Sequence, residues 1–171
     1  MATFLVDVQR IKNNSYLDNN VDDKTIKIAL LNAQEQLLEP VLGSKLYGVL
    51  TAGVAEGNLA LAYQNLIVNY VWKVLYHGTT YMVARNLLFR YTNSAIVKDS
   101  NANSTAIDVV DLNTMRDEEY LSYQFHVDKI QRYLVDNLST FPEYGETDND
   151  GIEAESGQNS IGFYYDGDDF Q

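Results

Sequence analysis

Two histidines, His77 and His126, are the side chains of this sequence best suited to act as general bases or to bind a transition metal. The helical patterns described below put them on different helices. Neither belongs to an HExxH-type pair, which would bring two ligands to one helix face. We therefore interpret both as structural histidines. The sequence has no cysteine, which excludes disulfides, thiol nucleophiles and cysteine-ligated zinc or iron–sulfur sites.

The acidic residues after position 143 come closest to a metal-binding motif. Glu146, Asp148, Asp150 and Gly151 fall on the first, third, fifth and sixth positions of a calcium-binding loop. The twelfth position of that loop requires a bidentate glutamate, but here it is Gly157, and no helical pattern follows. We expect a solvated acidic segment, no metal site and no cofactor.

The remaining nucleophiles and acids form no recognisable catalytic set. Serine and threonine are frequent, but the sequence lacks a nucleophile elbow, a glycine-rich phosphate loop and a dinucleotide-binding fingerprint. Glu118 and Glu119 are adjacent, so on a helix they point about 100° apart. They suit the start of a helix, where the helix dipole favours anions. The sequence predicts no catalytic residue and a protein that is not an enzyme.

The net charge is distributed unevenly along the chain. It is formally −12, from 24 acidic and 12 basic residues, and nine of the acidic residues lie from Glu143 onward, where there is no Lys or Arg. Residues 1–142 therefore carry only −3. Without a basic patch, we expect no binding to a nucleic-acid backbone or to an anionic membrane. Tyrosines without interleaved cations are assigned to the core or to subunit contacts: Tyr63, Tyr70, Tyr120 and Tyr123.

Hydrophobic periodicity predicts a mainly all-α fold, a compact bundle of about four or five helices. The helical domain is expected over residues 21–142, between an extended N-terminal arm at 1–20 and an acidic aromatic tail at 143–171. Apolar residues recur at three and four positions, and capping and breaking residues set the ends. The predicted helices cover 23–38, 44–57, 58–76 and 111–139, and the third resumes over 79–91 after a break at Gly78.

A corner is expected between the first two helices, over Glu39 to Gly43. Pro40 removes a backbone hydrogen bond from a helix interior, and Gly43 supplies a permissive backbone directly afterwards. Tyr47 completes this structural corner on the next helix, which Ser44 is expected to cap.

Two segments look suited to binding partners. Residues 92–113 are rich in Asn, Ser and Asp but contain two β-branched clusters, so we predict a β-hairpin or projecting loop at an interface. The tail ends in four aromatic residues within an acidic segment, the composition of a short linear anchor that orders on a partner. The candidate partner-binding residues are Ile96, Val97, Ile107, Val109, Phe163, Tyr164, Tyr165 and Phe170.

Several segments between residues 8 and 144 together resemble one family. They are Arg10-Ile11-Lys12-Asn13-Asn14, Asn20-Val21-Asp22, Ala33-Gln34, Leu38-Glu39-Pro40-Val41-Leu42-Gly43-Ser44-Lys45-Leu46-Tyr47, Tyr133-Leu134 and Phe141-Pro142-Glu143-Tyr144. In order and spacing they are similar to the head-to-tail connectors, or head-completion adaptors, of tailed bacteriophages. The similarity is greatest to the versions in Bacteroides phages, including crAss-like phages.

This resemblance implies a small α-helical virion protein with no catalytic activity. Such a subunit assembles as a ring with copies of itself, commonly twelve, beneath the portal protein. It joins the portal to a second ring or a tail protein, and DNA passes through the channel as non-specific cargo. The implied location is the head–tail interface of a virion assembled in the host bacterial cytoplasm, without a membrane partner.

Three other functions fit parts of the sequence. A monomeric helical regulatory module could dock through its acidic aromatic tail. An acidic DNA-mimic inhibitor would share the net charge, but it should display carboxylates over the whole folded body, and residues 1–142 are close to neutral. An enzyme would need a pocket with convergent titratable groups.

Overall fold

A computed structural model describes residues 3–17, 19–91, 96–98 and 109–145 of the chain. These residues are mainly α-helical, as predicted. The elements, in chain order, are α1 (Val8–Asn14), α2 (Asp23–Ala33), η1 (Gln34–Leu38), α3 (Glu39–Leu42), α4 (Ser44–Glu56), α5 (Leu61–Leu66), η2 (Ile67–Val71), α6 (Trp72–Leu88), β1 (Phe89–Tyr91), β2 (Ile96–Lys98), α7 (Val109–Asp136) and η3 (Pro142–Gly145). The segments η1 and η2 are π-helical turns, and η3 is a 3-10 helix.

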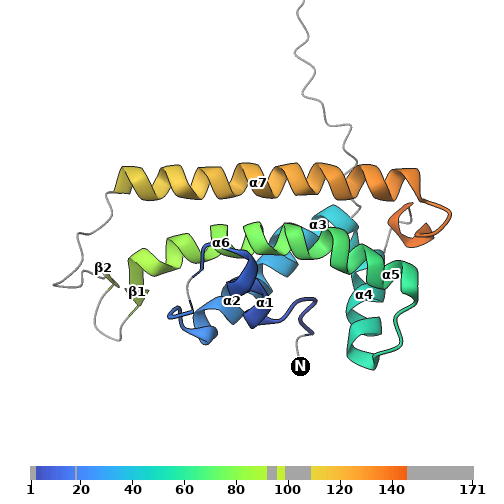
Figure 1. Cartoon of the computed structure of the whole chain (residues 1–171), viewed down its shortest axis with the longest axis horizontal. Coiled ribbons are helices and arrows are strands. Elements are labelled where there is room, and N and C mark those ends of the chain that lie inside the picture. Colours follow the sequence, from blue (N-terminus) through green and yellow to red (C-terminus); the bar gives the residue numbers. More distant parts are fainter. Residues whose placement is uncertain (1–2, 18, 92–95, 99–108, 146–171) are drawn as a thin grey trace, which may run out of the picture.

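Helix α6 lies at the centre of the bundle. The long helix α7 runs along one side of it, and α1 and α2 lie on the other side (Figure 1). The apolar positions of these helices recur at three and four residues, so each helix turns one stripe into a common core. Burying each such side chain stabilises the fold by about 1.5–3 kcal/mol. Fully buried members include Ile26, Leu30, Val71, Leu75, Ile130 and Leu134.

The predicted corner at residues 39–43 is shorter than expected. The helix continues from α2 through η1 and α3 as far as Leu42, and Pro40 lies in the first turn of α3. The π-helical turn η1 directly before Pro40, in which the Glu39 N–H donates to the Gln34 carbonyl, shifts the backbone hydrogen bonds of the helix at this point and accommodates the proline. The chain turns at Gly43, whose φ of 75° and ψ of 150° suit glycine. Ser44 does not cap α4, and its buried hydroxyl has no hydrogen-bond partner.

The extended arm predicted for residues 1–20 is wrong for residues 8–14, which are helical. Residues 8–14 form α1, which begins where the Asp7 carboxylate accepts a hydrogen bond from the Arg10 N–H at 2.8 Å. Leu5, Val6 and Ile11 are buried in the core. Hydrogen bonds to distant residues hold the segment before α1 on the core, because both backbone polar groups of Leu5 are bonded there. Its N–H donates to Gln34 Oε1 at 2.9 Å, and its carbonyl accepts from Trp72 Nε1 at 2.8 Å.

The predicted break at Gly78 is also wrong, because α6 runs through it without interruption. A Cβ on Gly78 would lie 3.3 Å from Leu37 Cδ1 and 3.6 Å from Tyr123 Cδ2. Glycine therefore allows η1 and α7 to approach α6 closely, and its conformational freedom is not used.

A short hairpin follows α6, but not between the two β-branched clusters. Strand β1 pairs antiparallel with β2, and Arg90 faces Val97 in the register. Ile96 and Val97 are in β2, whereas Val109 is the first residue of α7. Val109, predicted within the hairpin or loop of residues 92–113, is therefore helical, and Ile107 lies outside the described residues. The described residues also exclude Phe163, Tyr164, Tyr165 and Phe170.

Helix α7 ends at Asp136, and the chain then folds back onto α5. Phe141 and Tyr144 are buried, and the Tyr63 hydroxyl donates to the Glu143 carboxylate at 3.0 Å. None of the helices among the described residues is long and apolar enough to cross a membrane.

Candidate functional site

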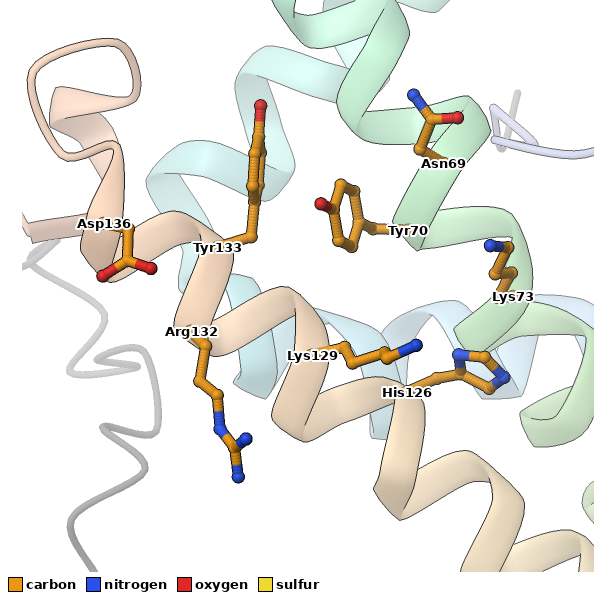
Figure 2. A pocket seen from close by; sticks show the side chains of 8 residues that line it. All are labelled: Asn69, Tyr70, Lys73, His126, Lys129, Arg132, Tyr133 and Asp136. Atoms are coloured by element: carbon orange, nitrogen blue, oxygen red, sulfur yellow. The ribbon is translucent and has the colours of Figure 1, made fainter.

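An open pocket of about 400 Å³ lies between the η2–α6 segment and α7. Its residues come from two helical faces. Residues 69 and 70 precede 73 by four and three positions, and 126, 129, 133 and 136 follow one another at three or four positions. The packing of α7 against α6 brings these faces together. The lining residues are Asn69, Tyr70, Lys73, His126, Lys129, Arg132, Tyr133 and Asp136 (Figure 2).

Aromatic rings and cations occupy different parts of this pocket. Tyr70 and Tyr133 face each other (Figure 2) in a stacked pair with ring centroids 4.4 Å apart. The ammonium of the pocket residue Lys129 lies 4.7 Å from the centre of the exposed Phe125 ring. The pocket therefore offers apolar ring surface beside positive charge.

The pocket is a positively charged site in an acidic protein. Lys73, Lys129 and Arg132 are exposed, and none of them forms an ion pair with another residue that the structure describes. Asp136 is the one acidic residue that lines it. Ammonium and guanidinium groups in this arrangement can bind carboxylates or phosphates, and a guanidinium can do so with two parallel hydrogen bonds.

The two histidines lie on different helices, as predicted, but the packing of those helices brings them together. Their rings are nearly parallel, with centroids 5.2 Å apart, and His77 Nδ1 is 2.9 Å from Glu119 Oε2. Burial, and then the nearby His77, Lys73 and Lys129, lower the pKa of His126 to about 4. His126 is therefore neutral near pH 7 and adds no charge to the pocket.

Glu119 has a different role from the one predicted for it. Because α7 begins at Val109, Glu119 lies several turns inside the helix and not at its start. Its side chain is nearly buried against His77, whereas Glu118 is exposed. The sequence did contain a sign that Glu119 is buried. Residues 119 and 126 share one helix face with the core residues Tyr123 and Ile130, because the four positions are three or four apart.

The chemistry available here is binding. Within the described ranges, no group of three His, Asp or Glu side chains could hold a metal ion. The His77–Glu119 pair is a part-buried contact between α6 and α7. The chemical character of the pocket comes from its lysines, arginine and tyrosine rings, which suit an anionic ligand.

Two of the predicted partner-binding residues, Ile96 and Val97, lie away from this pocket. Ile96 and Val97 follow the C-terminal end of α6, whereas Lys73 is near its N-terminal end. A helix of this length spans about 25 Å. Of the predicted corner residues, Pro40 lies on α3, Gly43 is the turn between α3 and α4, and Tyr47 lies on α4. The Tyr47 hydroxyl accepts a hydrogen bond from Gln34 Nε2 at 3.4 Å.

Sequence reasoning missed a row of apolar side chains on α7, which we call the outer stripe. Leu121, Phe125 and Val135 have exposed fractions of 64%, 56% and 53%. They share one helix face with the exposed charged residues Asp128 and Arg132, because positions 121, 125, 128, 132 and 135 are three or four apart. The prediction of an amphipathic last helix considered only the stripe that packs on the core.

Comparison with known proteins gives one family. Residues 38–153 match the model of DUF6712, a family of unknown function. The chain belongs to the DUF6712 family. The match covers more than half of the chain and includes every residue that lines the pocket of this DUF6712 protein. No curated protein and no solved structure gives a significant match to the chain.

Proposed function

We propose that this chain is a structural virion protein, without catalytic activity, that forms a ring joining the portal of a tailed-phage capsid to the tail or to a second ring. Copies of itself, the portal protein and the next ring or tail protein are its partners. DNA passes through the channel as cargo.

The outer stripe of α7 is the observation that carries this proposal. Monomeric proteins rarely expose long rows of large apolar side chains, and such rows typically mark contacts with other proteins. Leu121, Phe125 and Val135 lie along the 28-residue helix α7, and no other element of the described residues packs over them. A neighbouring copy would bury them.

Two further features support a ring. A cyclic ring uses two unlike surfaces on each subunit, and the hairpin β1–β2 offers a second surface at the end of α6. The connector-like segments Leu38 to Tyr47 and Phe141 to Tyr144 form a turn and a short segment after α7, both with side chains buried in the core. The net charge of −12 is also suited to a channel from which DNA must be released, because like charges repel.

Light scattering on the purified chain, alone and mixed with the candidate portal protein, tests the proposal. The expected species contains twelve copies of the 19.4 kDa chain, roughly 233 kDa, alone or on the portal. Images of that species should show rings. A 19.4 kDa monomer that persists and does not bind the portal protein would contradict the ring and favour a monomeric binding module.

A matched pair of variants tests the outer stripe. Leu121→Glu/Val135→Glu places two charges on the stripe and should abolish the large species. Ile28→Glu/Leu61→Glu changes two aliphatic residues that are 50% and 71% exposed on α2 and α5, and it should leave assembly intact. Equal assembly of both variants would remove the stripe from the interface.

A further inference from the structure

The pocket between η2–α6 and α7 concentrates cations that have no anionic partner in the described structure. Lys73, Lys129 and Arg132 are three of the 12 basic residues in the chain. Like charges held close together repel one another, so an anionic ligand that neutralises them stabilises the arrangement. The tyrosine pair at the same site favours a ligand that also carries aromatic groups.

The chain itself contains a segment with this chemistry. Residues 146–171 contain eight acidic residues and no Lys or Arg. The same segment carries Phe163, Tyr164, Tyr165 and Phe170. Carboxylates match the lysines and the arginine of the pocket, and the aromatic rings match Tyr70 and Tyr133.

The starting point and the length of the segment allow it to reach the pocket. It follows η3, and α7 ends at the pocket residue Asp136. The pocket face of α7, from His126 to Asp136, is about 15 Å long. An extended chain covers about 3.3 Å per residue, so the 26 residues from 146 to 171 are several times longer than this face. A tethered segment also has an effective concentration on the order of millimolar at its site.

We infer that this pocket binds the chain's own acidic aromatic tail, residues 146–171, with tail carboxylates on Lys73, Lys129 and Arg132 and tail aromatic rings beside the tyrosine pair. Nucleic acid is the competing ligand for such cations. The tail is favoured because each copy of the chain carries one. In addition, residues 1–145 have a net charge of −4 and offer no extended basic surface. The inference is independent of the proposed ring.

Photocrosslinking in the full chain tests it, because the absence of native cysteines allows a single label. The uncharged pocket residue Asn69 is replaced (Asn69→Cys) and labelled with benzophenone maleimide. After illumination, the captured residues are located by mass spectrometry. Mixing isotopically light and heavy copies distinguishes capture within one chain from capture between chains. The expected result is capture of residues 146–171 within the same chain, reduced at high salt.

Two charge-reversal variants with the same spacing complete the test. Lys129→Glu/Arg132→Glu changes exposed cations three positions apart on α7, and we expect capture of the tail to fall about tenfold. Lys24→Glu/Lys27→Glu makes the same change on the exposed face of α2 and should leave capture unchanged. Circular dichroism checks that both variants remain helical.

Three results would overturn the inference. They are no capture of the tail, equal capture in the two charge-reversal variants, and capture only between copies, which would make another subunit the ligand. A further measurement, with a short DNA duplex added to the labelled full chain, tests nucleic acid as the ligand. Displacement of the tail by this DNA at physiological salt would assign the pocket to nucleic acid instead.

Discussion

The ring of His126 lies parallel to the ring of His77, with centroids 5.2 Å apart, where α7 packs on α6. His77 also contacts Glu119 through Nδ1, whereas His126 faces Lys73 and Lys129. A proton on His126 would therefore stand in a partly buried site beside His77 and two cations. The stability of the packing between α6 and α7, the two longest helices, should therefore depend on pH.

The first prediction concerns the loss of stability in acid. The pKa of folded His126 is about 4, below its ordinary value of 6.5. Above pH 6.5 both states are neutral at this residue. As the pH falls toward 4, the unfolded chain binds a proton that the folded chain does not, so the free energy of unfolding decreases. Because the ring is only partly buried, we expect His126 to lower the free energy of unfolding by about 1 kcal/mol over this range.

Replacing His126 with an uncharged residue should remove this component. His126→Gln is expected to lose less stability than the wild type between about pH 7 and pH 4.5. Urea unfolding followed by the fluorescence of Trp72, the single tryptophan, measures the difference. Gln124→Ala, an exposed change on the same helix, is the control and should keep the wild-type slope. Identical slopes for His126→Gln and the wild type would contradict the assignment.

The second prediction concerns Gln34, which is fully buried and holds the N-terminal segment on the core. Its Oε1 accepts from the Leu5 N–H at 2.9 Å, and its Nε2 donates to the Thr3 carbonyl at 3.0 Å. Gln34→Ala leaves both backbone groups without this partner and creates a cavity. We expect a loss of about 2–3 kcal/mol in the free energy of unfolding.

Gln36 provides a matched control for this substitution. It lies two positions away on the same π-helical turn but is exposed. Gln36→Ala should change the stability by less than about 0.5 kcal/mol. Chemical denaturation of the two variants gives the comparison. Equal stabilities would show that the N-terminal segment does not depend on Gln34.

The sequence was most informative where one helix could be considered by itself. Ile26, Ala29, Leu30 and Ala33 follow the helical period so closely that α2 is evident before any packing is known. The choice of glycine at position 78 could not be interpreted in this way. A glycine that breaks a helix and a glycine that admits a neighbouring helix look the same in a sequence, and Leu37 and Tyr123 decide between them.

The pocket could not be predicted for a similar reason. Lys129 and His126 share a face of α7, but whether that face meets Lys73 depends on how α7 is rotated against α6. No local pattern fixes this rotation. The N-terminal segment was misjudged because the partners of its backbone, Gln34 and Trp72, are distant in sequence.

The third prediction concerns the turn at Gly43. Its φ of 75° and ψ of 150° lie in a region that is essentially restricted to glycine. Gly43→Ala should therefore lower the free energy of unfolding by about 1–3 kcal/mol. Gly48 is the control, because it is exposed within α4 and a Cβ there would meet no atom within 4 Å. Gly48→Ala should stabilise the protein by about 0.5–1 kcal/mol. Thermal unfolding should thus shift in opposite directions, and a shared direction would contradict this account of Gly43.

The last prediction concerns the anchor that precedes the acidic tail. The Tyr63 hydroxyl donates to both oxygens of Glu143, at 3.1 and 3.0 Å, and its ring packs edge-on against Phe141 with centroids 5.2 Å apart. Tyr63→Phe keeps the ring contact and removes the hydrogen bond. Since the pair is partly exposed, we expect a loss of only about 1 kcal/mol in global stability.

The local effect of Tyr63→Phe should be clearer than the global one. The Tyr144 amide, which donates to the Phe141 carbonyl at 3.1 Å, should exchange with solvent about fivefold faster when η3 opens more often. Amides in the middle of α6 should exchange at unchanged rates, because they do not depend on this anchor. Tyr16→Phe removes a hydroxyl from a side chain that is 85% exposed and should change neither rate. Unchanged exchange at Tyr144 in the Tyr63 variant would mean that the buried rings of Phe141 and Tyr144 hold η3 in place without the hydrogen bond.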